Sequence, residues 1–115
     1  MALIIMCVDE PLQFSEKQWD AYTVQRDAWF AAILQQPGCR EIRGYMSPFY
    51  GTSPGSAAHI EFESMAEARS FLETDVYRRI ISEARGAGCT NLQLQVWDVR
   101  PGFAEPLRPE AATAN

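Results

Sequence analysis

An alternation of apolar and polar residues within positions 57–63 constrains the fold of this chain more than any other feature. Its apolar members are Ala58, Ile60 and Phe62, and its polar members are His59, Glu61 and Glu63. Successive side chains of a β-strand point to opposite faces of the sheet, so the pattern predicts a strand with one buried face. We therefore expect a sheet that is covered by other elements on one side.

Three further segments are expected to join this strand. Residues 2–8 form a continuous apolar run, which is typical of a strand buried on both faces. Residues 41–46 predict a short strand, and residues 47–56 are rich in Pro, Gly and Ser, which favours a long hairpin loop. Residues 92–99 alternate again, with Gln93, Gln95 and Trp97 on one face.

Two capping patterns predict where helices begin. Ser15 and Gln18 have the spacing of a capping box, and the first helix is expected to end at Pro37, which cannot continue it. Ser64 and Glu67 have the same spacing and open a second helical segment that ends at residues 86–88. Residues 74–75 are an expected interruption of this segment, because Thr and Asp favour helix caps over helix interiors.

The resulting order is β-α-β-β-α-β, which predicts an α+β, ferredoxin-like fold. In this arrangement two helices pack on one face of a four-stranded antiparallel sheet. Residues 1–102 are expected to form a single domain, and residues 103–115 a mobile C-terminal tail, because that segment is rich in Pro and Ala.

Composition excludes several classes of function. Ten Lys and Arg against 15 Asp and Glu give a net charge of −5, which argues against nucleic acid and anionic membranes as partners. No apolar run approaches the roughly 20 residues that cross a bilayer, and residues 2–8 lack the basic flank of a signal peptide. The 3 cysteines are far apart and have no C-x-x-C spacing, so we expect no disulfide framework and a cytoplasmic location.

Several segments resemble the dimeric α/β-barrel superfamily, which includes antibiotic-biosynthesis-monooxygenase-like and stress-responsive barrel proteins. They are Pro37-Gly38, the strand and helix start from His59 to Leu72, and the segment from Asp75 to Arg78. The resemblance implies that two subunits join their open sheet faces into a barrel. It also implies a ligand space between sheet and helices or between the two sheets.

The sequence gives an independent reason to expect a homodimer. A sheet with helices on one side leaves its other face bare, and here that face carries Tyr45, Trp97 and Val99. An apolar patch of this kind is more stable when paired, and a symmetric dimer is the commonest solution.

The open face is also expected to carry the candidate site. His59 could exchange a proton near neutral pH, and Arg43 and Tyr45 could stabilise an enolate or phenolate oxygen. Trp97 offers a flat surface for an aromatic ligand. Further expected substrate-binding residues are Glu61, Gln93, Gln95 and, from the long loop, Tyr50.

Each of these residues also has a structural interpretation. His59 could be a hydrogen-bonded strand residue, and Arg43 and Glu61 could form a cross-strand ion pair. Trp97 could be dimer core, and the aromatic residues of the first helix are assigned to packing. Tyr50 could be part of a lid or of a dimer contact.

These residues and the resemblance together lead to one main hypothesis. The protein is expected to be a small cofactor-independent monooxygenase, or an isomerase or cyclase, for an aromatic or polyketide-type molecule. The haem-degrading relatives use an Asn on the first strand and a His on the second helix, and this sequence has neither. We therefore expect no cofactor, and the set of His59, Glu61 and Glu63 is too sparse to predict a metal site. The alternative is a non-catalytic ligand-binding or stress-related dimer.

Overall fold

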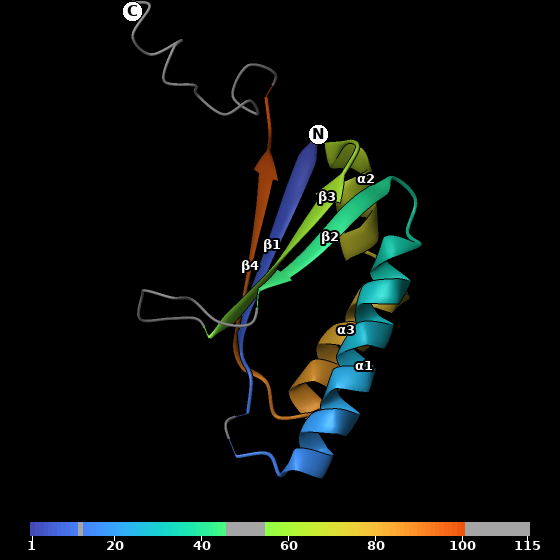
Figure 1. Ribbon diagram of the computed structural model, residues 1–115. Coiled ribbons are helices and arrows are strands. Elements are labelled where there is room, and N and C mark those ends of the chain that lie inside the picture. Colours follow the sequence, from blue (N-terminus) through green and yellow to red (C-terminus); the bar gives the residue numbers. More distant parts are fainter. Residues whose placement is uncertain (12, 46–54, 101–115) are drawn as a thin grey trace, which may run out of the picture.

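The computed structural model describes residues 1–11, 13–45 and 55–100. Its elements follow the order β1 (Ala2–Asp9), α1 (Glu16–Leu34), β2 (Cys39–Tyr45), β3 (Ser56–Phe62), α2 (Met65–Leu72), α3 (Asp75–Gly86) and β4 (Thr90–Asp98). The strands form one antiparallel sheet in the order β2-β3-β1-β4. All three helices of the described residues lie on one side of this sheet (Figure 1). The predicted ferredoxin-like α+β fold is confirmed. The expected tail at residues 103–115 lies outside the described residues.

The first helix begins as its sequence predicts. The backbone N–H of Gln18 donates to Ser15 Oγ at 3.2 Å, and Gln18 Oε1 accepts from the Ser15 backbone N–H at 2.8 Å. This reciprocal pair satisfies two of the free N–H groups at the helix start. The rings of Phe14 and Trp19 pack edge to face with centroids 5.5 Å apart, so the expected apolar staple is also present.

The second helical segment is divided into α2 and α3 at the predicted position. Thr74 Oγ1 accepts from the Tyr77 backbone N–H at 3.2 Å and donates to the Phe71 carbonyl at 2.6 Å. The side chain of Thr74 thus bridges the end of α2 to the start of α3. Ser64 caps α2 by accepting from the Glu67 backbone N–H at 3.2 Å.

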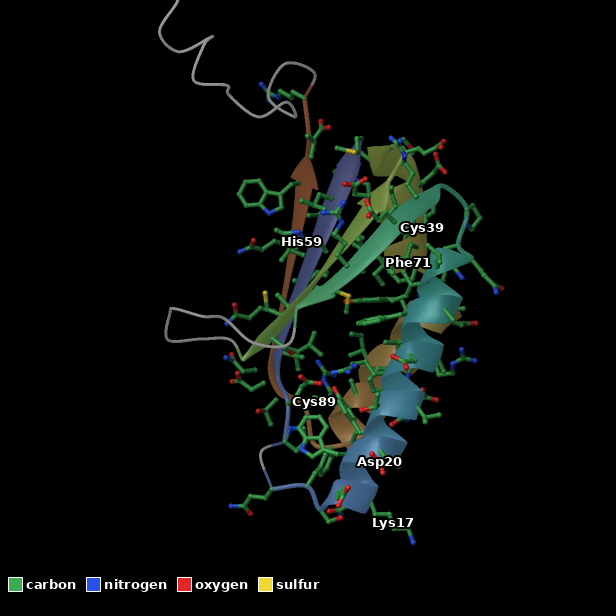
Figure 2. All side chains as sticks on the ribbon, in the orientation of Figure 1. Lys17, Asp20, Cys39, His59, Phe71 and Cys89 are labelled. Atoms are coloured by element: carbon green, nitrogen blue, oxygen red, sulfur yellow. The ribbon has the colours of Figure 1, made fainter. Side chains whose placement is uncertain are left out.

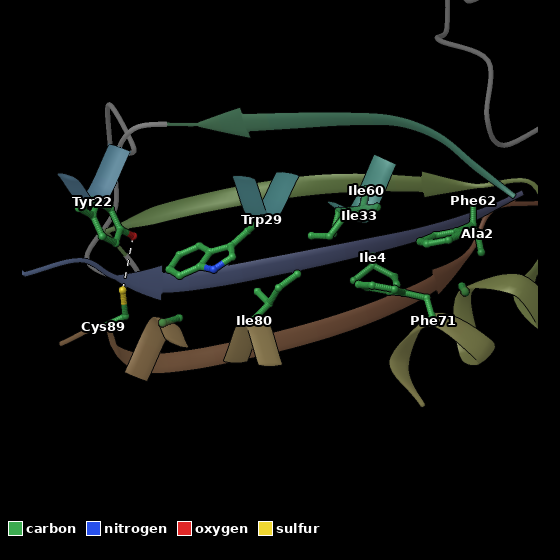
Figure 3. Close-up of a cluster of buried hydrophobic side chains, with 12 residues drawn as sticks. Ala2, Ile4, Tyr22, Trp29, Ile33, Ile60, Phe62, Phe71, Ile80 and Cys89 are labelled. Atoms are coloured by element: carbon green, nitrogen blue, oxygen red, sulfur yellow. Dashed lines mark hydrogen bonds between the residues drawn. The ribbon is translucent and has the colours of Figure 1, made fainter. Parts of the chain in front are cut away.

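The core lies between the sheet and the helices. Ile4, Ile60 and Phe62 have no exposed surface, and the ring of Phe62 stacks on Phe71 with centroids 5.6 Å apart. Figure 3 shows this apolar cluster at one end of the layer, with Trp29 and Ile80 toward the other end. The alternation along β3 therefore places its apolar side chains on the helix side, as predicted.

The prediction that β1 is buried on both faces is wrong for the single chain. Ala2 and Ile4 are fully buried beneath the helices, whereas Leu3 and Ile5, on the other face, are half-buried. This difference arises because none of the three helices covers that face (Figure 1). The edge strand β4 is exposed on both sides, and Trp97 retains 53% of its surface.

One polar contact is buried between α1 and the start of β4. The hydroxyl of Tyr22 lies 3.4 Å from Cys89 Sγ (Figure 3). Burial, followed by the contact with Cys89, raises the pKa of Tyr22, and the nearby carboxylate of Glu10 raises it further. Burial also raises the pKa of the Cys89 thiol.

Replacing Phe71 by Ala is expected to lower the free energy of unfolding by about 3–5 kcal/mol, because it opens a cavity against Phe62. Urea denaturation of the wild type and the variant measures this difference. The matched control is Val24→Ala on the exposed side of α1, for which we expect a change within about 0.5 kcal/mol. Equal effects of the two substitutions would contradict the core described above.

The protein is expected to lose stability in alkaline solution. Tyr22 and Cys89 have higher pKa values in the folded chain than when unfolded, so the unfolded state releases their protons first. Their contribution to the free energy of unfolding is complete below the pKa values of the unfolded chain, about 9 for Cys and about 10 for Tyr. It declines as pH rises above those values. Urea denaturation between pH 8 and pH 11 measures this decline, and Tyr22→Phe is expected to make it shallower. If the free energy of unfolding falls equally steeply with pH in the wild type and in Tyr22→Phe, the Tyr22 hydroxyl ionises as freely in the folded state as in the unfolded state, which contradicts this prediction.

Candidate functional site

The open face of the sheet carries most of the predicted site residues. Arg43 on β2 lies directly opposite His59 on β3, and Ile5 on β1 lies between His59 and Gln95 of β4. Leu3 in turn separates Glu61 from Trp97. Figure 2 shows His59 among the strands and Phe71 toward the helices.

A hollow of about 130 Å³ lies on this face. Its lining is Leu3, Glu41, Arg43, His59 and Glu61. Arg43 Nε donates to Glu41 Oε1 at 2.8 Å. This ion pair joins two residues of the same strand, β2, that are two positions apart. Both side chains are well exposed, and such pairs contribute little to stability. The structure thus brings together three predicted residues and adds Glu41.

The predicted residues of β4 do not line this hollow. The indole N–H of Trp97 donates to Gln95 Oε1 at 3.2 Å, and Gln93 Nε2 donates to Asn91 Oδ1 at 3.3 Å. These contacts run along β4 and leave about half of the surface of Trp97 exposed, at 53%. Tyr45 is the last residue of β2, but its side chain is outside what the structure describes, as is the whole of Tyr50.

A larger cavity of about 280 Å³ lies between the sheet and the helices, and we call it the inner pocket. Side chains from α1, α3 and the sheet form its apolar walls. They include Met6, Trp29, Phe30, Ile33, Ala58, Ile80, Ala84 and Leu92. Ala58 is a small residue on the sheet side of the pocket, and the Phe30 ring of α1 packs closely against Gly44, where a Cβ would lie 3.1 Å from that ring.

Polar groups gather at one corner of the inner pocket, which we call the polar corner: Glu10, Tyr22, Arg26 and Cys89. Arg26 Nη1 donates to Glu10 Oε2 at 3.2 Å, and the guanidinium carbon lies 5.7 Å from the centre of the Tyr22 ring. The side chains of Arg26 and Glu10 are only 18% and 10% exposed, so this ion pair is largely shielded from water. Shielding makes the pair electrostatically stronger than one at the surface.

The resemblance implied a ligand space between sheet and helices or between two sheets, but sequence reasoning assigned no residues to the inner pocket, because it interpreted Tyr22 and Trp29 mostly as packing. Both are buried, but both also line the cavity. One signal was present in the sequence: Arg26 lies in line with Tyr22, Trp29 and Ile33 at helical spacing. A cation on the apolar stripe of a helix calls for a buried anionic partner, and Glu10 is that partner.

The described residues offer no conventional metal site. Within residues 1–11, 13–45 and 55–100, no group of three or more His, Cys, Asp or Glu side chains is placed to hold a metal ion. In the same part of the chain, no helix combines the length and the apolar character that crossing a membrane requires.

Comparison with known proteins relates the chain to others by its fold. No protein-family model and no curated protein sequence matches it. A solved structure of a candidate antibiotic biosynthesis monooxygenase from Deinococcus radiodurans superposes with a TM-score of 0.69 at 13% identity, covering 94% of this chain and 99% of the other. A dimeric ferredoxin-like protein of unknown function from Jannaschia sp. CCS1 superposes with a TM-score of 0.63 at 14% identity, covering 86% of this chain and 100% of the other. The structure of an antibiotic biosynthesis monooxygenase superposes with a TM-score of 0.60 at 15% identity, covering 88% of this chain and 100% of the other. The expected resemblance is thus confirmed for the fold: the chain has the ferredoxin-like architecture of antibiotic-biosynthesis-monooxygenase-like and dimeric ferredoxin-like proteins.

Proposed function

We propose that the protein binds a hydroxylated aromatic or polyketide-type molecule in the inner pocket and oxygenates it without a cofactor. The observation that carries this proposal is the pocket itself, an apolar cavity of about 280 Å³ with the polar corner at one end. Apolar walls with a few convergent polar groups are typical of small-molecule sites. The likeness to structures described as monooxygenases supports the reaction class.

The reaction needs little from the protein beyond binding and deprotonation. An electron-rich substrate, once deprotonated, can itself reduce molecular oxygen. For an anthrone, one O₂ oxidises the ring methylene to a carbonyl, and the second oxygen atom leaves as water. The protein would hold the ring between apolar walls and stabilise the anion through nearby charges.

A second candidate site is the hollow on the open face. In this alternative His59 acts as the acid or base, Arg43 and Tyr45 stabilise the developing anion, and Trp97 stacks on the ligand. Glu61, Gln93, Gln95 and Tyr50 would complete the substrate-binding set. The observation that favours it is the close placement of Arg43, His59 and Glu61 around one hollow of about 130 Å³.

We further propose that the protein is a homodimer joined through its open sheet faces. The support is apolar surface on the open face, where Trp97 of β4 is 53% exposed and the neighbouring Leu3 and Ile5 of β1 are only half-buried. Two of the similar structures are described as dimeric. A cytoplasmic location remains a prediction from the cysteine pattern.

Oxygen uptake and quinone absorbance with an anthrone test the proposed function. The wild type is expected to accelerate oxidation at least about tenfold over the spontaneous rate. Ala58→Leu fills the inner pocket and is expected to lower both binding and rate at least about tenfold, because the added atoms occupy the ligand's space.

Three comparisons separate the two sites and the two function classes. Ala31→Leu, on the exposed side of α1, is the matched control and should behave like the wild type. His59→Ala should also keep its activity; if it alone loses activity, the site is the open-face hollow. Binding without oxidation would favour the non-catalytic, ligand-binding protein.

Light scattering tests the homodimer. The wild type is expected to have twice the mass of one chain, and Trp97→Glu is expected to weaken the dimer at least about tenfold by placing a charge in an apolar contact. Val24→Glu is the matched control, because Val24 is an exposed apolar residue on α1, away from the sheet. A single-chain mass for the wild type, or dissociation by Val24→Glu alone, would contradict this interface.

A further inference from the structure

The inner pocket contains one group suited to accept a proton from a ligand. Glu10 follows β1 directly, and its carboxylate is held by Arg26 from α1 at 3.2 Å. Both side chains line the pocket, and neither is more than 18% exposed. A carboxylate in this position meets a bound molecule at the polar corner of an otherwise apolar space.

The other titratable groups near this carboxylate are poorly suited to the role. Tyr22 and Cys89 have raised pKa values and remain protonated at neutral pH, so they act as hydrogen-bond donors. Arg26 is a permanent cation. Asp27 also borders the pocket but is exposed, and His59 is on the opposite face of the sheet.

We propose that Glu10 is the proton acceptor of the inner pocket and that Arg26 stabilises the anion formed on the ligand. This inference rests on the proposed function. The ligand's acidic O–H or C–H bond breaks, the proton moves to a carboxylate oxygen of Glu10, and the electron pair stays on the ligand as a phenolate or enolate. The transfer needs no oxidant, because oxygen enters only afterwards.

Charge balance favours this arrangement. Before the transfer, the cation of Arg26 is balanced by the Glu10 carboxylate; afterwards it is balanced by the ligand anion. The net charge of the polar corner is the same in both states, so no unpaired charge is created in a shielded space. A fixed guanidinium beside the developing anion is the kind of preorganised charge that lowers a reaction barrier.

The same geometry predicts which ligands the pocket prefers. A neutral phenol can donate its hydroxyl proton to Glu10, whereas a carboxylate of the same shape has no proton to give and is repelled. We therefore expect the wild type to bind 2-naphthol at least about tenfold more tightly than 2-naphthoate, as a hydrogen bond to a charged group allows.

Binding of these two probes, followed by calorimetry, tests the inference without relying on turnover. Glu10→Gln removes the repulsion and leaves Arg26 to pair with naphthoate, so the preference for naphthol is expected to fall at least about tenfold. Glu63→Gln, at an exposed carboxylate, is the matched control and should keep the wild-type preference. In the anthrone assay, Glu10→Gln should bind within about threefold of the wild type and oxidise about 10²–10⁴-fold more slowly.

Each outcome is decisive. If the wild type binds naphthol and Glu10→Gln keeps its preference, the role of Glu10 is wrong while the pocket stands. A wild type that prefers naphthoate would make Arg26 an anchor for anionic ligands and overturn the inference. Failure to bind either probe overturns the proposed pocket, and the role of Glu10 with it. Should Glu10→Gln not fold, the double variant Glu10→Gln/Arg26→Gln replaces the pair by two amides, and its preference should fall at least about threefold.

Discussion

The structure depends on one constraint: in the part of the chain that the structure describes, helices cover only one face of the sheet. Along β1 and β3 every second side chain enters the helix layer, and Ile4, Ile60 and Phe62 lose all contact with water. Burying each of these side chains contributes about 1.5–3 kcal/mol, so the two central strands anchor the fold. None of the described helices covers the opposite face, where Leu3 and Ile5 remain half-buried.

The helix layer itself is not filled evenly, and this creates the inner pocket. At one end the rings of Phe62 and Phe71 stack on each other, and neither lines the inner pocket. Toward the other end the sheet presents Ala58, whose small side chain lines the inner pocket together with Tyr22 and Trp29 of α1. The same layer therefore provides both the stable core and the cavity, at different points along the strands.

The features that sequence reasoning predicted correctly are local or periodic. The caps at Ser15 and Thr74 depend on residues within three positions, and the faces of β3 follow from simple alternation. The inner pocket depends on contacts between distant segments, such as Tyr22 with Cys89, which are 67 residues apart. No local sequence pattern predicts a contact between residues so far apart, so the sequence favours packing as the main role of the aromatic residues of α1. The open-face residues were placed on the correct side, but their grouping around one hollow needed the strand register.

Packing and binding are not separate roles for the residues of α1. Trp29 is buried and donates its indole N–H to Glu83 at 2.7 Å, which fixes the ring that forms one wall of the pocket. Tyr22 is held in the same way by Cys89, and Arg26 lies over its ring. Rings fixed by hydrogen bonds on one side present a defined surface on the other, so a ligand would lose little free energy in ordering them. The polar partners that satisfy these buried side chains thus also prepare the pocket, and the pair formed by Glu10 and Arg26 adds a balanced charge to that prepared surface.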